Sequence, residues 1–222
     1  MGRAIDPAQV AVVEAAVARD LDSSVTGRRR FALAAALGLC GLRWCEVARL
    51  RVHDVSPAGT VCVRPVKGGR RRVVRVGPGL AGRLLRLGDA RVAAVRCRGA
   101  GVNVGGVLLF CGRCGRVPSK QYVQAEARRF FRRVLGAPCY TFHCLRHTAA
   151  ARAWLATRDL VACQRFLGHR WLSSTEVYLA SLLPCGEVPL PSCAGGVLGG
   201  PAVALFNPDG LPVRRLRPVP AA

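Results

Sequence analysis

Two short β-branched runs, Thr60–Val66 and Arg71–Val76, stand in a chain whose other periodic segments are helical. The four residues between them, Lys67 to Arg70, include the glycine pair that is typical of a tight hairpin turn. Elsewhere the apolar residues recur at the three- and four-residue spacing of helices that bury one face. The sequence therefore predicts a mainly α fold with a small antiparallel β-sheet, an α+β architecture, with Lys67 at or beside the hairpin tip.

Polar residues mark where several of these helices begin. Asp6 is followed by a proline, and Gln9 stands three residues on, where it would complete a capping box. A later helix is expected to begin near Thr141. Ser173-Ser-Thr-Glu176 repeats the capping-box pattern. We therefore expect Tyr178 to lie early on the last helix.

The chain is strongly basic, with 34 Lys and Arg against 12 Asp and Glu in 222 residues and a formal net charge of +22. Such an excess usually indicates a polyanionic partner, because basic groups near phosphates release counterions. A basic protein of membrane surfaces would need an amphipathic basic helix, whereas this charge is spread along most of the chain. The uncharged run Val188–Pro208 is broken by prolines and glycines, so no membrane helix is expected. The charge therefore favours nucleic acid over membrane.

Eleven cysteines are scattered along the chain, several of them within apolar helical patterns, where a free thiol behaves as a small apolar side chain. With no signal-peptide pattern at the N-terminus, a reducing setting is expected, cytoplasmic or, in a eukaryotic host or virus, nuclear. Cys111-Gly-Arg-Cys114 has the spacing of half a zinc site, but the sequence offers no second such pair. A loop with two free thiols is the preferred interpretation, and no metal or other cofactor is expected.

Six side chains suited to phosphodiester chemistry occur at intervals along the chain. His143 and Arg146 share a helical face near a helix start, where a phosphate would meet a forked donor and the positive helix terminus. Taken singly, each of the six has an ordinary structural interpretation, such as a buried histidine or a half-buried aromatic ring. No carboxylate cluster accompanies them, so the set favours phosphoryl transfer through a tyrosine without a metal. The six are Arg43, Lys67, His143, Arg146, His169 and Tyr178.

The order and spacing of these residues resemble the tyrosine recombinase, or phage integrase, family over about residues 5–182. The resemblance rests on four stretches of sequence: Gly41-Leu-Arg-Trp-Cys-Glu-Val-Ala-Arg-Leu50, Lys67-Gly68, His143-Cys-Leu-Arg-His147, and Leu167-Gly-His169 followed by Tyr178. It implies that residues 1–182 form the catalytic domain of that family, with no separate N-terminal core-binding domain. Residues 183–222 would then form a tail rich in proline and glycine.

The resemblance also implies an activity: site-specific cleavage and rejoining of double-stranded DNA by a tetramer assembled on the DNA. Tyr178 would attack the scissile phosphate to give a 3′-phosphotyrosyl enzyme and a free 5′-hydroxyl, without a metal. Arg43 and Arg146 would bind the non-bridging oxygens, and Lys67 would protonate the leaving 5′-oxygen.

By the same resemblance, the histidines would handle protons and hydrogen bonds at the phosphate. His143 would assist proton transfer at the nucleophile, and His169 would donate to a phosphate oxygen. Glu46 is expected to orient the helix that follows the first arginine, and His147 is expected to support the reacting groups.

Three alternatives remain open at this point. A type IB topoisomerase uses nearly the same chemistry to relax supercoiled DNA as a monomer, although the His-Cys-Leu-Arg-His and Leu-Gly-His boxes favour a recombinase. A DNA-binding protein could retain the fold after losing turnover, but all six expected positions are occupied. A general nucleic-acid packaging protein would account for the charge alone.

Overall fold

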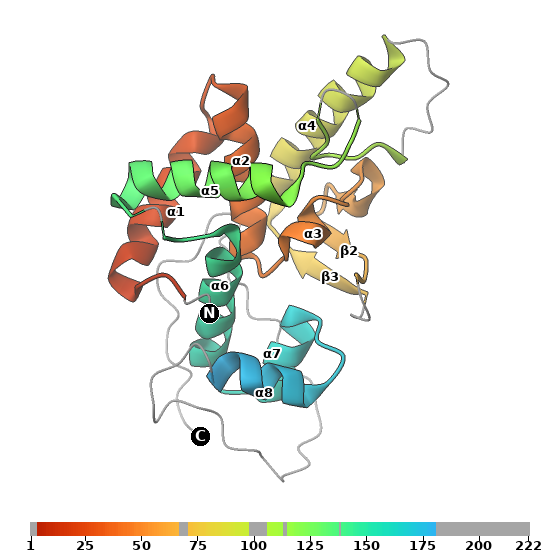
Figure 1. Ribbon diagram of the computed structural model, residues 1–222. Helices are drawn as coiled ribbons and strands as arrows, with labels where there is room; N and C mark the ends of the chain where they lie inside the picture. The colour runs from red at the N-terminus through yellow and green to blue at the C-terminus, as the bar shows by residue number, and fades with distance from the viewer. Residues whose placement is uncertain (1–3, 67–70, 98–105, 113–114, 138, 181–222) are drawn as a thin grey trace.

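The computed structural model describes residues 4–66, 71–97, 106–112, 115–137 and 139–180. Within them are eight α-helices and one small antiparallel sheet, which lies at one side of the molecule (Figure 1), and this confirms the predicted fold class. The elements are α1 (Pro7–Leu21), α2 (Thr26–Leu39), α3 (Trp44–Val47), η1 (Val52–Asp54, a 3₁₀ turn), β1 (Val55–Ser56), β2 (Thr60–Val63), β3 (Arg72–Arg75), α4 (Pro78–Arg96), α5 (Lys120–Leu135), α6 (Phe142–Thr157), α7 (Leu160–Leu167) and α8 (Leu172–Ala180).

The first helix begins as predicted, but only half of the expected capping box forms. The carboxylate of Asp6 accepts a hydrogen bond from the backbone N–H of Ala8. Gln9 does not complete the box. Its side-chain oxygen instead accepts a hydrogen bond from the Tyr140 hydroxyl at 2.9 Å, which ties α1 to the segment that leads into α6. A long-range contact has therefore replaced the local one.

Helix α2 is the centre of the main core. Its residues from Phe31 to Leu39 are all buried, and α1, α5 and α6 lie around it (Figure 1). A run of alanines keeps this helix narrow, so that its neighbours approach closely. At Gly38 even one added carbon would lie 3.1 Å from the Cβ of Leu145 and from the ring of Phe142 on α6. This contact fixes the start of α6 against the end of α2.

The β-sheet has the order β1-β2-β3, and β2 pairs with β3 in antiparallel register. Val61 lies opposite Val74, and all four valines that face inward along the three strands, Val55, Val61, Val63 and Val74, are buried. Pairing of these two strands confirms the predicted hairpin, with strands shorter than the apolar runs suggested. Lys67 and the Gly-Gly turn lie outside the described residues.

The last two helices form a smaller unit against the far end of α6 (Figure 1). Their apolar cluster is separate from the main core, and Phe166 and Tyr178 pack against it. The cluster consists of Ala150, Ala153, Trp154, Leu160, Cys163, Leu167 and Leu179. Helix α8 begins at Leu172, so Ser173 lies inside the helix, and the capping-box prediction at this position is wrong.

Within the described ranges, no helix has both the length and the apolar composition that crossing a bilayer requires. Residues 183–222, expected to form a Pro- and Gly-rich tail, lie outside those ranges.

The turn between α2 and α3 requires glycine at position 41. Gly41 has φ +84°, and a Cβ there would lie 2.8 Å from the ring of Phe166 on α7. The close approach joins the main core to the α7–α8 unit, since no side chain stands between the turn and that ring.

We expect Gly41→Ala to lower the free energy of unfolding by about 2 to 3 kcal/mol, because it adds left-handed strain and a steric clash. Chemical denaturation of both proteins measures the difference. Gly27→Ala is the control, since Gly27 is exposed on α2 with nothing within 4 Å of an added Cβ, and it should be neutral or slightly stabilising. Adding Phe166→Leu to Gly41→Ala should restore part of the lost unfolding free energy. If it restores none, a clash between the added Cβ and the Phe166 ring is excluded.

Candidate active site

Arg43 stands directly before α3, in extended backbone conformation, with Glu46 one turn later. The Arg43 backbone N–H donates to the Glu46 carboxylate at 2.7 Å, and its guanidinium donates to the other carboxylate oxygen at 3.4 Å. Glu46 thereby closes the start of α3, as expected. The side chain of Arg43 remains 31% exposed while that of Glu46 is buried, so the arginine can still reach a ligand.

Arg72, on β3, is the partner of Glu46 that the sequence analysis missed. Its guanidinium donates to both carboxylate oxygens at 2.9 Å, and only 8% of its side chain is exposed. The register of β2 and β3 could have revealed this partner, because Arg72 pairs with Val63, whose side chain is fully buried. Residues directly opposite each other in a sheet point to the same face, so Arg72 must point inward.

The charge state of Glu46 follows from these contacts. Burial by itself raises the pKa of the carboxyl group, but the hydrogen bonds and charges of Arg72, the Arg43 N–H and the charge of Arg146 together hold the pKa below its ordinary value. Glu46 is therefore an anion among three cations. The cluster retains an excess of positive charge, which suits a dianionic or phosphodiester ligand.

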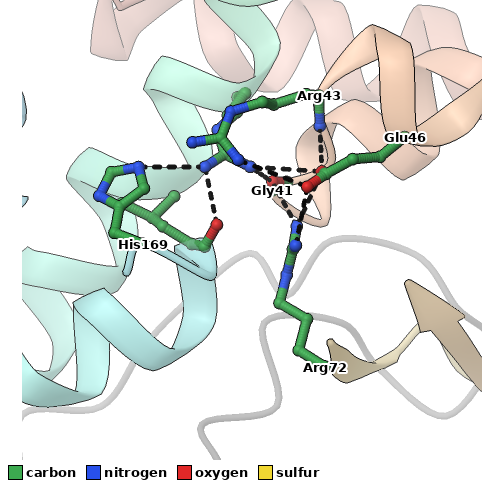
Figure 2. A network of polar contacts seen from close by, with 7 residues as sticks. Gly41, Arg43, Glu46, Arg72 and His169 are labelled. Atoms are coloured by element: carbon green, nitrogen blue, oxygen red, sulfur yellow. Dashed lines mark hydrogen bonds and ion pairs between the residues drawn. The ribbon is translucent and has the colours of Figure 1, made fainter. Parts of the chain in front are cut away.

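Arg146, on α6, is fully buried and lies at the centre of the site. Its guanidinium donates to the carbonyl oxygens of Gly41 and Leu167, the latter at 2.8 Å, and lies 3.6 Å from the Glu46 carboxylate (Figure 2). Burial, followed by the charge of Arg43, lowers its pKa to about 10. The group is still a cation at neutral pH, and main-chain atoms fix its position.

His169 follows the end of α7, where Gly168 adopts the left-handed conformation that ends the helix. Its Nε2 lies 3.3 Å from the guanidinium of Arg146, and its Nδ1 lies 2.9 Å from the hydroxyl of Thr175 on α8. Burial, followed by the charges of Arg146 and Arg43, lowers the pKa of His169 to about 4. The imidazole is therefore neutral at neutral pH.

Three imidazole rings surround the phenol ring of Tyr178. His147 stacks on it with ring centroids 5.0 Å apart, while His169 and His143 meet it edge-on at 5.4 and 6.5 Å. Burial raises the pKa of Tyr178, whereas the charge and hydrogen bond of Arg146 and then the charge of Arg43 act in the opposite direction. Both guanidinium groups thus act on the same hydroxyl.

His143 and His147 lie one turn apart on α6 with ring centroids 4.4 Å apart. His143 is accessible to solvent, but protein atoms packed round its ring desolvate it, and this desolvation, followed by the charges of Arg146 and Arg43, lowers its pKa. His147 is buried. Burial, followed by the charges of His143 and Arg146, lowers its pKa to about 4. The ring at the surface is thus placed to exchange protons, and the buried ring supports Tyr178.

The structure therefore gathers five of the six residues that the sequence analysis singled out, within one chain. Lys67, the sixth, lies outside the described residues. So does Cys114, which leaves only one thiol of the considered zinc pair, Cys111, in view. Across the part of the chain that the structure describes, no three His, Cys, Asp or Glu side chains converge to hold a metal ion. Besides Arg72, the analysis missed Thr175 and the two carbonyl oxygens that hold Arg146.

We expect Arg72→Met to lower the free energy of unfolding by about 3 kcal/mol, because it removes the two-bond partner of a buried carboxylate. Urea denaturation at neutral pH measures the loss. Arg75→Met is the matched control, since Arg75 is an exposed arginine on the same strand, and its substitution should change stability by about 0.5 kcal/mol or less. Equal effects of the two substitutions would contradict the assigned ion pair.

Acid should destabilise the fold through the buried histidines. The pKa values of His147 and His169 are about 4 in the folded protein against 6.5 ordinarily, so the unfolded chain binds more protons between these pH values. The unfolding free energy should be fully retained above pH 6.5 and should fall toward pH 4 by about 1.4 kcal/mol per pH unit for each histidine. Urea denaturation across this range tests the slope. His169→Gln should remove the contribution of one histidine to this slope. An unfolding free energy that does not change between pH 6.5 and pH 4 would refute the prediction.

Comparison with known proteins agrees with this geometry. A model of the phage integrase family matches residues 10–183. The tyrosine recombinase XerC of Chromobacterium violaceum is 32% identical over 142 residues, which cover 64% of this chain and 44% of that protein. The chain spans about half the length of the curated relatives it matches.

Two solved structures share the fold. The XerA recombinase superposes with a TM-score of 0.61 at 20% identity, over 83% of this chain and 61% of that one. The XerH site-specific recombinase, bound to its difH substrate in a pre-cleavage complex, gives a TM-score of 0.59 at 20% identity, over 79% of this chain and 49% of that one. With the family match extending over most of its length, the chain belongs to the phage integrase family.

Proposed function

We propose that this protein is a site-specific DNA recombinase, or integrase, that cleaves and rejoins double-stranded DNA through a 3′-phosphotyrosyl intermediate. One observation carries the proposal: the Tyr178 phenol lies among three imidazoles, with the charges of Arg146 and Arg43 both acting on its hydroxyl. The net charge of +22 and the XerH complex with difH support DNA as the partner. Self-association on that DNA, as a tetramer, is proposed from the family resemblance.

In the proposed step, the Tyr178 oxygen forms a bond to the scissile phosphorus while the bond from phosphorus to the 5′-oxygen breaks. The phenol loses its proton, and the leaving 5′-oxygen gains one. Negative charge builds on the two non-bridging oxygens, where Arg43 and Arg146 stabilise it. Loss of one such preorganised donor typically raises the barrier by about 3 kcal/mol. Since the guanidinium groups supply this positive charge, the step requires no metal.

The histidines and the hairpin lysine complete the proposed proton transfers. His143 is exposed beside the Tyr178 ring and its pKa is lowered, so a neutral imidazole is present there to accept the phenolic proton. His169 would donate to a non-bridging oxygen. Lys67, to which we assign this role on the family resemblance alone, would protonate the leaving 5′-oxygen. Attack by the 5′-hydroxyl of another strand reverses the sequence and rejoins the DNA, since the phosphotyrosyl bond conserves the energy of the broken one.

Because the target site has to be found, we propose selection from nicked suicide duplexes that carry a randomised segment. The intact protein should become covalently attached to a subset of sequences, recovered as adducts that survive denaturation, and chelation of metals should not reduce their yield. Tyr178→Phe should give no adducts yet still bind DNA, with an affinity that falls steeply as salt increases.

Tyr122→Phe provides the matched control, because Tyr122 is exposed on α5 away from the site, and it should yield adducts at the wild-type level. Plasmids with and without the selected sequence then separate the rival activities. Relaxation of supercoils without the sequence would indicate a topoisomerase, and adducts that persist in Tyr178→Phe would disprove the assigned nucleophile. Binding unaccompanied by any adduct would indicate a DNA-binding protein that has lost turnover.

A further inference from the structure

We propose that Thr175 is a positioning residue, which stabilises the tautomer of His169 that Arg146 selects and lets this tautomer change when a phosphate binds. Thr175 is fully buried on α8, three residues before Tyr178, and its hydroxyl oxygen lies 2.9 Å from His169 Nδ1. The catalytic consequence rests on the proposed recombinase function. The tautomer itself is a property of the free protein and can be measured without DNA.

The tautomer of the free protein follows from the two neighbours of the His169 ring. The Arg146 guanidinium has only N–H donors, and it lies 3.3 Å from His169 Nε2. Nε2 must therefore present its lone pair. A neutral imidazole carries one proton, which then belongs to Nδ1, where it is donated to the Thr175 hydroxyl oxygen. Burial and the surrounding arginines keep the ring neutral at physiological pH, since they lower its pKa to about 4.

This tautomer cannot perform the role proposed for His169 during cleavage. To donate to a phosphate oxygen from Nε2, the ring must carry its proton on that nitrogen. A phosphate would compete for the N–H groups of Arg146 and so remove the donor that faces Nε2. The ring would then give up its Nδ1 proton to water and take one at Nε2 from water, so that its charge stays the same.

A hydroxyl group serves both tautomers, because it can accept a hydrogen bond or donate one. With Nδ1 protonated, the Thr175 oxygen accepts. With Nε2 protonated, the Thr175 O–H rotates and donates to Nδ1. A backbone carbonyl or a carboxylate in this place could only accept and would hold the ring in the form that cannot donate to a phosphate. Thr175 is suited to this switch for that reason.

The position of Thr175 also links this histidine to the nucleophile. Thr175 and Tyr178 are one turn apart on the same helix, so they share a face of α8. The His169 ring contacts both of them, Thr175 by a hydrogen bond and Tyr178 edge-on at 5.4 Å. Correct seating of α8 therefore places the nucleophile and sets the histidine at the same time.

The decisive measurement is nitrogen-15 NMR of the ring nitrogens in histidine-labelled free protein, with His169 assigned by comparison with His169→Gln. We expect the wild-type ring to be protonated on Nδ1. Thr175→Ser should preserve that state, while the isosteric Thr175→Val should shift the ring toward a mixture of tautomers. Finding the wild-type ring protonated on Nε2, or the same ring signals in Thr175→Val as in wild type, would overturn the proposal.

The second measurement is the rate of covalent adduct formation on the selected duplex. Thr175→Val should be slower by on the order of 10- to 100-fold, as for loss of a hydrogen bond that orients a functional histidine, and Thr175→Ser should restore the rate. Ser174→Ala, at an exposed position on the same helix, is the control and should be unaffected. Should the wild type form no adduct, the recombinase function fails while the tautomer result still decides the role of Thr175. A Thr175→Val rate equal to wild type would refute that role.

Discussion

A single buried carboxylate makes the rest of the site possible. The Glu46 carboxylate accepts a hydrogen bond from the backbone N–H of Arg43 and two from the guanidinium of Arg72, and it lies 3.6 Å from the guanidinium of Arg146. Without an anion at this position, the guanidinium groups would repel one another in a largely buried region, where such repulsion is screened less than in bulk water. One negative charge is enough to hold the arginines together, and too little to neutralise them. The balance leaves a site that is stable when empty and still attracts a phosphodiester.

The site also draws on two different packing units. Arg43 and Arg146 lie next to residues of the main core, Leu42 and Leu145, whereas Tyr178 packs against the smaller apolar cluster of α7 and α8, and His169 follows the end of α7. The two units meet at Gly41, where the turn after α2 touches the ring of Phe166. Residues that bind a charge are thus held by the larger core, and the group that would react is carried on the smaller one.

Much of this arrangement could be predicted from the sequence, because local rules decide it. The helical spacing, the β-branched hairpin and the start of α6 near Thr141 were all readable, and five of the six singled-out residues do come together. The errors share one cause. Gln9 was assigned by local capping logic and Thr175 was passed over inside a capping-box pattern, yet their side chains contact residues of other segments, Tyr140 and His169. Arg72 was missed because an inward-pointing charge is visible only once strand register is known. Lys67 and the domain boundaries remain predictions.

Arg146 is held by the carbonyl oxygens of Gly41 and Leu167, and this attachment has an evolutionary meaning. A main-chain acceptor survives every substitution that preserves the path of the backbone. Side chains around the arginine can therefore change without moving its guanidinium, provided that the backbone keeps its path. At Gly41 and Leu167, selection must therefore conserve the backbone conformation that directs each carbonyl oxygen toward Arg146, more than the chemistry of the side chain.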